Sequence, residues 1–154
     1  MSAEEMEQFE EMGPIDYVIL GWPDRIPSGG TIAPMIVDLV DRGIIRIIDV
    51  AFIAKDDDGT IVALDLESLP DDSAFSEFDG ASSGVMGMSD LQEAGSALEP
   101  GSSAAVLVWE NLWAAPLAVA LRKSGAQLLD SGRIPIQAVI AALDALEAEA
   151  EAVN

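Results

Sequence analysis

Two segments of this chain carry the same order of helix and strand signals. In each, Ala-Pro opens an apolar run and a glycine ends it; the prolines are Pro34 and Pro116, the glycines Gly43 and Gly125. The two prolines lie 82 positions apart and so do the two glycines, so no insertion separates these marks. An apolar strand pattern precedes each copy. Two copies of strand, helix and strand predict a duplicated split βαβ, ferredoxin-like α+β fold with an antiparallel sheet.

Hydrophobic periodicity and turn residues predict the remaining elements. We expect the two repeat helices to cover one face of the sheet, with Leu117, Ala120, Leu121 and Ser124 turned inward. Pro135 begins an amphipathic C-terminal helix, and either this helix or a second subunit is expected to cover the other face. The sheet order is predicted as last, first, fourth, second, with the third strand added by a hairpin. The five expected strands are residues 16–22, 44–54, 60–66, 104–109 and 127–134.

The length and composition predict one domain. A chain of 154 residues is long enough to bury a single core. Residues 1–13 are rich in glutamate and are expected to form an acidic flexible tail. Residues 14–150 then form a single ferredoxin-like domain, with an irregular insertion at about 67–88 that is rich in Ser, Asp and Gly.

The absence of two residue types limits the chemistry. The sequence contains no histidine and no cysteine, so it lacks the usual general base near neutral pH, the thiolate nucleophile and the commonest transition-metal ligands. We therefore predict that the protein is not an enzyme, and we assign no catalytic, cofactor-binding or metal-binding residue and no cofactor. The net charge of −21 repels phosphate backbones, so nucleic acid is not an expected partner.

Targeting signals are also missing from the sequence. The N-terminal residues have neither the positive nor the apolar region of a signal peptide. No run of about 18 apolar residues occurs, so we predict no membrane span. The expected location is cytoplasmic.

Three polar segments are candidate ion sites. The loop Pro27–Thr31 precedes a helix but lacks the lysine of a phosphate loop, so an ordinary helix entry is favoured. Asp56, Asp57 and Asp58 do not have calcium-loop spacing and are expected to form a charged hairpin tip. A second acidic group offers carboxylates that could bind a divalent ion or take part in acid–base work, but clustered acids in a polar loop are usually solvated. Its members are Asp71, Asp72, Glu77 and Asp79.

The tryptophans and the terminal helix supply the candidate interface. Trp22 and Trp109 occupy equivalent repeat positions on antiparallel strands, so they are expected at opposite ends of the sheet and not in one aromatic box. Core packing is the simplest role for a tryptophan, although tryptophan is also enriched at subunit interfaces. The residues assigned to a candidate interface are Trp22, Trp109, Trp113, Ile136, Ile140 and Leu143.

Three motifs resemble a family of bacterial proteins of unknown function, many of them labelled membrane proteins. The motifs are Asp49–Asp56 with Gly59, then Pro100–Ala104, then Trp109-Glu110-Asn111 followed by Trp113–Pro116. The third is similar to a shorter, soluble actinobacterial branch, and the resemblance extends from Ile15 to about Leu143. The long apolar segment of the membrane-labelled relatives is replaced here by a short polar one at 78–94. The resemblance implies no catalytic residue.

These observations favour a non-enzymatic domain, structural or regulatory, that acts by self-association or by binding a partner protein. A dimer is the expected assembly because strands 44–54 and 104–109 are apolar on both faces. The alternative is a small-ligand sensor with its site at a subunit interface, an inference from fold analogy alone. A divalent-metal carboxylate enzyme is the third and weakest hypothesis.

Overall fold

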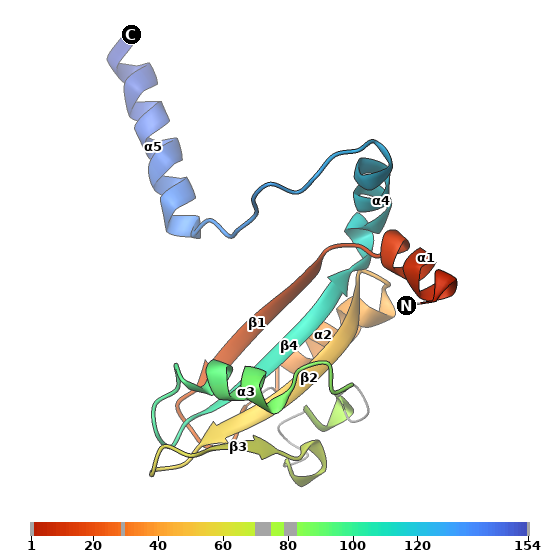
Figure 1. Cartoon of the computed structure of the whole chain (residues 1–154). Coiled ribbons are helices and arrows are strands. Elements are labelled where there is room, and N and C mark those ends of the chain that lie inside the picture. Colours follow the sequence, from red (N-terminus) through yellow and green to blue (C-terminus); the bar gives the residue numbers. More distant parts are fainter. Residues whose placement is uncertain (1, 29, 70–74, 79–82, 154) are drawn as a thin grey trace. The chain divides into compact units, whose positions relative to one another are not determined.

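The computed structural model of the chain describes residues 2–28, 30–69, 75–78 and 83–153, which form two compact units, Met1–Ser124 and Gly125–Asn154. The first unit contains an antiparallel sheet with helices, so the chain has a mixed α+β fold (Figure 1). The expected limits of a single domain, 14–150, stay a prediction. The strands are β1 (Ile15–Trp22), β2 (Ile45–Lys55), β3 (Ile61–Leu64) and β4 (Ser103–Asn111). The α-helices are α1 (Ala3–Glu11), α2 (Ile32–Asp41), α3 (Met88–Gly95), α4 (Ala115–Lys123) and α5 (Ile136–Val153), and the short 3₁₀ helices are η1 (Leu66–Ser68), η3 (Phe75–Phe78) and η4 (Leu112–Ala114).

The four strands lie in the order β1-β4-β2-β3, all antiparallel to their neighbours. This matches the predicted order of the first four strands. The predicted fifth strand, 127–134, is wrong, because residues 126–135 form neither helix nor strand. That segment contains Asp130-Ser131-Gly132, residues depleted in strands, and its apolar residues do not alternate. The ferredoxin-like duplication therefore stays a prediction, and β1 lies at an edge of the sheet.

A β-bulge at Ile48 divides β2 into two parts. Ile47 pairs with Trp109 and Asp49 pairs with Val108, so Ile48 has no partner of its own on β4. An extra residue reverses the side-chain alternation of a strand. Ile47 therefore packs on the same face as Val50, whereas strict alternation predicts opposite faces.

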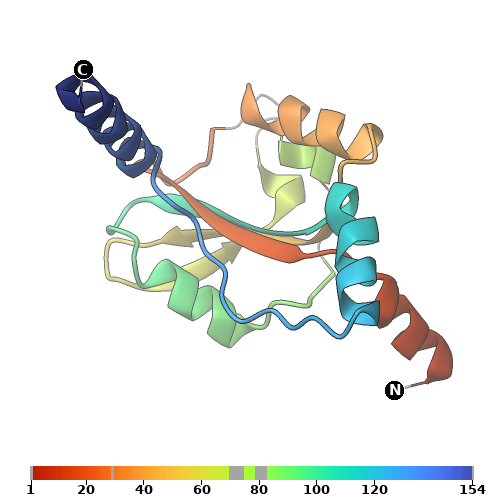
Figure 2. The same cartoon turned by 90° about the horizontal axis from the view of Figure 1, so that it is seen from above.

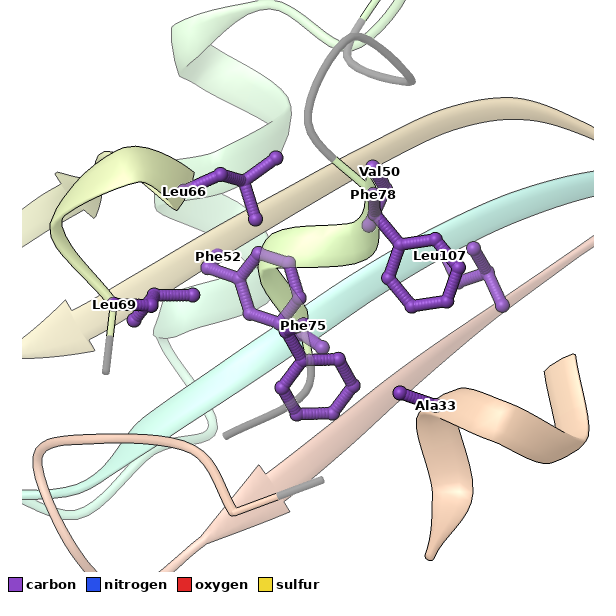
Figure 3. Packing of buried hydrophobic residues seen from close by; sticks show 9 residues of the cluster. Ala33, Val50, Phe52, Leu66, Leu69, Phe75, Phe78 and Leu107 are labelled. Atoms are coloured by element: carbon purple, nitrogen blue, oxygen red, sulfur yellow. The ribbon is translucent and has the colours of Figure 1, made fainter. Parts of the chain in front are cut away.

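The larger core lies between the sheet, α2 and the insertion. Phe75 of η3 packs against Phe52 with ring centroids 4.8 Å apart and against Trp22 at 5.6 Å. Figure 3 shows Phe75 and Phe78 over the strands, with Leu66 and Leu69 beside them. The insertion, expected to be an irregular excursion, therefore supplies two aromatic rings of the core, those of Phe75 and Phe78.

The opposite face of the sheet carries a second, smaller core beneath α3. Leu91 and Ala94 of α3 pack on Ile53, Ala104 and Val106. Figure 2 shows α2 and α3 on opposite sides of the sheet. Helix α3 covers this second face over β2 and β4. The prediction that the second face is covered is therefore confirmed in part.

Helix α4 does not lie on the sheet, which differs from the prediction. Both views place it beyond the end of the sheet, beside α1 (Figures 1 and 2). Arg122 of α4 donates hydrogen bonds of 2.7 and 2.6 Å to the carbonyl oxygens of Glu10 and Met12, at the end of α1. Leu117, Ala120, Leu121 and Ser124, predicted to face inward, are exposed.

The N-terminal segment, predicted as a tail, is helical over Ala3–Glu11. Its start is a reciprocal capping box. The Glu5 amide donates to the Ser2 hydroxyl at 3.1 Å, and the Ser2 amide donates to the Glu5 carboxylate at 2.7 Å.

The glycines that end the two repeat helices have the backbone conformation that the sequence predicts. Gly43 has φ of 71° and Gly125 has φ of 87°, values that favour glycine at a helix C′ position. After α2 the amides of Gly43 and Ile44 donate to Val40 and Leu39, the paired bonds of a Schellman motif.

The second unit contains the predicted C-terminal helix. Pro135 precedes α5, and the carbonyl of Pro135 accepts hydrogen bonds from Ala138 and Val139. Ile136, Ile140 and Leu143 follow one another at helical spacing and form an apolar stripe, which Val139 and Leu146 widen.

Candidate functional site

A hollow of about 360 Å³ lies between β1 and α3. We call it the β1–α3 groove. It exists because α3 covers β2 and β4 but leaves the apolar side chains of β1 open on this face. Tyr17 is 70% exposed here, and Ile19 is also exposed. The apolar lining consists of Tyr17, Ile19, Met86, Ala94, Val106 and Val108.

The remaining lining residues of the β1–α3 groove are acidic. Asp90 and Glu93 lie three positions apart on α3, hence on one side of that helix. Asp16 lines the groove from β1, but it lies opposite Trp109 in the strand register, so its carboxylate is on the face that α2 covers. One oxygen of Asp90 accepts a hydrogen bond of 2.9 Å from the Gly87 amide. The groove therefore has an apolar floor and a negatively charged rim.

Asn111 connects Asp16 with two tryptophans. Its amide nitrogen donates to Asp16 at 2.7 Å and to the Pro14 carbonyl at 3.2 Å. Its oxygen accepts from the indole nitrogens of Trp109 at 3.1 Å and Trp113 at 3.3 Å. Only one orientation of the Asn111 amide satisfies these donors and acceptors, so Asn111 fixes the start of β1 against the end of β4.

Glu110, next to Asn111, anchors the start of β1. Arg46 donates to one of its oxygens through two nitrogens, and the Gly13 amide donates to the other at 2.8 Å. Burial alone would raise the pKa of Glu110, but the Gly13 and Arg46 hydrogen bonds and the Arg46 charge outweigh it and lower that pKa below its ordinary value. The side chain is thus held as a carboxylate whose partners are all internal.

Among the described residues Asp49 is the other buried carboxylate, 2% exposed, and it follows the bulge in β2. Its two oxygens accept from the amides of Val50 at 2.9 Å, Ser83 at 2.9 Å and Met86 at 2.8 Å. The Ser83 hydroxyl donates to the Ile48 carbonyl at 2.7 Å. Asp49 therefore attaches residues 83–86, which lead into α3, to the sheet, and this positions Met86 in the β1–α3 groove.

The Pro100–Ala104 motif holds the opposite end of the sheet. The amide of Gly101 donates to the Lys55 carbonyl at 2.7 Å, and the Lys55 amide donates to Ser102 at 3.0 Å. The Ser103 hydroxyl donates to the Asp24 carbonyl at 2.7 Å, which ties down the loop after β1. Like the hydrogen bonds of Asp49 and Asn111, those of this motif pair backbone groups and stabilise the fold.

A second exposed apolar surface lies on η4 and α4. Trp113 of η4 is 68% exposed, Leu117 of α4 is 61% exposed, and Leu121 follows one turn later. We call these three residues the α4 stripe. No residue of α4 itself is buried, so this helix contributes a surface and not a core.

The structure separates the tryptophans assigned to the candidate interface. Trp22 and Trp109 are half-buried, pack on the face of the sheet that α2 covers, and lie at opposite ends of it, as predicted. Trp113 is exposed in the α4 stripe. Ile136, Ile140 and Leu143 lie on α5, in the second unit.

The β1–α3 groove was not predicted from the sequence. Tyr17 and Ile19 alternate with Val18 and Leu20, a signal that β1 has two apolar faces, but the expected fifth strand made β1 an interior strand. Asp90 and Glu93 carried no signal beyond helical spacing.

The acidic segments do not form a metal site in the part of the chain that the structure describes. No group of three or more acidic side chains there is arranged to hold a cation. Asp56, Asp57 and Asp58 lie at the β2–β3 hairpin, where Asp56 pairs with Arg25. Asp71, Asp72 and Asp79, and the side chain of Glu77, lie outside the described residues.

Among the described residues, no helix has the length and apolar character needed to cross a membrane.

The fold and its exposed surfaces define a small α+β domain with an open-edged antiparallel sheet. The model of a family of unknown function, DUF6325, matches residues 11–152, so the chain belongs to this family. Neither a curated protein sequence nor a solved structure matches the chain.

Proposed function

We propose that this chain is a non-enzymatic binding domain that acts in the cytoplasm by associating with a second copy of itself. The observation that carries the proposal is the α4 stripe. Helix α4 buries none of its residues, and its Leu117 and Leu121, with Trp113 of the preceding η4, expose apolar area that a partner would cover. Contiguous apolar surface is rare on monomers and normally marks an interaction site.

The composition supports the same proposal. Without histidine or cysteine, the chain lacks the residues that most enzymes use as general base, nucleophile or metal ligand. Its buried carboxylates, Asp49 and Glu110, are occupied by backbone amides and an arginine. A structural or regulatory role by association needs none of that chemistry.

The charge predicts the form of the interface. At −21 per chain, two copies repel each other, so the contact must be apolar at its centre with carboxylates at its rim. The α4 stripe supplies such an apolar centre, and the stripe of α5 with Ile136, Ile140 and Leu143 offers a second apolar surface.

Light scattering over a wide concentration range at moderate salt tests the proposal. We expect the mass of two chains for the wild type, a shift toward one chain for Leu117→Lys, and a smaller shift for Ile140→Lys. Met35→Lys is the matched control, because Met35 is 67% exposed on α2 and belongs to neither stripe. A wild-type mass of one chain at every concentration overturns the proposal. A melting shift with small molecules, without association, favours the ligand-sensor alternative.

A further inference from the structure

We infer that the β1–α3 groove binds an extended segment of a partner protein, and that this segment adds to β1 as a fifth strand. The side chains that it turns toward α3 are apolar and basic. The occupant is a different protein from the one that self-association needs, and the residues involved are not those of the α4 stripe.

The backbone of β1 supplies the first part of the argument. β1 pairs with β4 on one side only, and in the sheet of the described residues it has no neighbour on the other. In an antiparallel strand, alternate residues direct their N–H and C=O groups to opposite sides, so an edge strand offers a row of them to an incoming chain. Addition of a strand to such an edge is a recurrent mode of peptide recognition.

The side chains of β1 supply the second part. Tyr17 and Ile19 point to the α3 side and are exposed, and Val106 and Val108 of β4 continue the apolar floor. A strand laid beside β1 turns every second side chain toward this floor. The hollow of about 360 Å³ has room for a small number of such side chains.

Charge selects the partner. Asp90 and Glu93 of α3 line the groove on the face to which Tyr17 and Ile19 point, and among the described residues no lysine or arginine does. A segment that presents lysine or arginine beside its apolar side chains complements this rim, whereas a second copy of this chain would bring its own acidic surface against the same carboxylates. Charge complementarity also speeds association with a basic partner, because the whole chain is strongly negative.

The test uses the full chain and a fluorescein-labelled octapeptide, Val-Thr-Lys-Thr-Val-Thr-Lys-Thr, called the valine–lysine peptide. When it is extended, valine and lysine lie on the same face, which can turn toward α3. We expect saturable binding by anisotropy, together with shifts of the β1 amide resonances from Ile15 to Trp22. The same peptide with alternate backbone nitrogens methylated along the pairing edge should bind at least tenfold more weakly. The valine–glutamate peptide, which has glutamate in place of both lysines, should not bind.

Two charge-reversal variants separate the groove from general electrostatics. Asp90→Lys with Glu93→Lys should weaken the valine–lysine peptide at least tenfold. Asp38→Lys with Asp41→Lys, the same spacing and the same change of charge on α2, should leave its affinity within about twofold. Equal losses for both pairs, binding unaffected by N-methylation, or resonance shifts elsewhere than at β1 and α3 each overturn the inference. The mass in solution reports separately on self-association, since none of these residues belongs to the α4 stripe.

Discussion

Arg46 of β2 donates two hydrogen bonds, 2.9 and 2.6 Å long, to a single oxygen of Glu110 on β4. The two residues lie directly opposite each other in the strand register, so the sheet itself brings the charges together. The guanidinium remains half-exposed, but the carboxylate is buried, and its second oxygen holds the Gly13 amide. Glu110 thus joins both central strands to the segment that enters β1.

Replacing this carboxylate should make stability less dependent on pH. Glu110→Gln is expected to lower the free energy of unfolding by about 2 kcal/mol at pH 7, the scale of hydrogen bonds to a charged group. Because the folded-state pKa lies below the ordinary value of 4.5, the contribution is complete above about pH 4.5 and is lost as pH falls through the folded-state pKa. Urea unfolding of both proteins between pH 3 and 7 should therefore show curves that converge in acid. A constant difference across this range would contradict the assignment.

The buried carboxylate at the bulge should be important for the position of α3. Asp49→Ala leaves the amides of Val50, Ser83 and Met86 without this acceptor, and we expect a loss of about 2–3 kcal/mol in the free energy of unfolding. Hydrogen exchange at Ser83 and Met86 should accelerate more than exchange in β1. Asp41→Asn, an exposed acid at the end of α2, is the control and should change stability by less than about 0.5 kcal/mol. Unchanged exchange at Ser83 and Met86 in Asp49→Ala would show that the contacts are dispensable.

The insertion should prove as important to stability as the strands. Phe75 is buried against Phe52 and Trp22, so Phe75→Ala is expected to cost about 3–4 kcal/mol. Leu117→Ala removes a similar apolar group from the α4 stripe and should cost less than about 1 kcal/mol in the unfolding of a single chain. Urea unfolding at low protein concentration compares the two variants directly. If Phe75→Ala costs no more than Leu117→Ala, the insertion is not part of the core.

Local sequence signals were sufficient for the parts of the fold that depend on neighbouring residues. Gly43 and Gly125 end their helices as predicted, because a glycine after an amphipathic run is a local signal. The hairpin at Gly59 and the order of the first four strands also follow from turn residues and the repeat.

The remaining features depend on contacts distant in sequence. An apolar stripe such as Leu117 with Leu121 shows that a helix is amphipathic, but not whether a sheet or another surface lies opposite. In the sequence, Phe75 lies in a segment rich in Asp, Ser and Glu, so hydrophobic periodicity could not assign it to the core. The single extra residue at Ile48 reverses the faces that the following β2 side chains occupy, and no residue propensity predicts this bulge. The β1–α3 groove was missed for the same reason, since it depends on where α3 ends and on β1 being an edge strand.

The last prediction concerns the amide that two tryptophans share. Asn111→Ala removes the acceptor of the Trp109 and Trp113 indoles and the donor to Asp16, and we expect a loss of about 1–2 kcal/mol in stability. The three indole N–H resonances provide an internal control, because Trp22 lies at the other end of β1 and should keep its chemical shift while the other two move. Gln92→Ala, an exposed amide on α3, should move none of the three. If Trp109 and Trp113 keep their shifts in Asn111→Ala, the shared hydrogen bonds do not form in solution, and Asn111 then does not fix the start of β1 through Asp16.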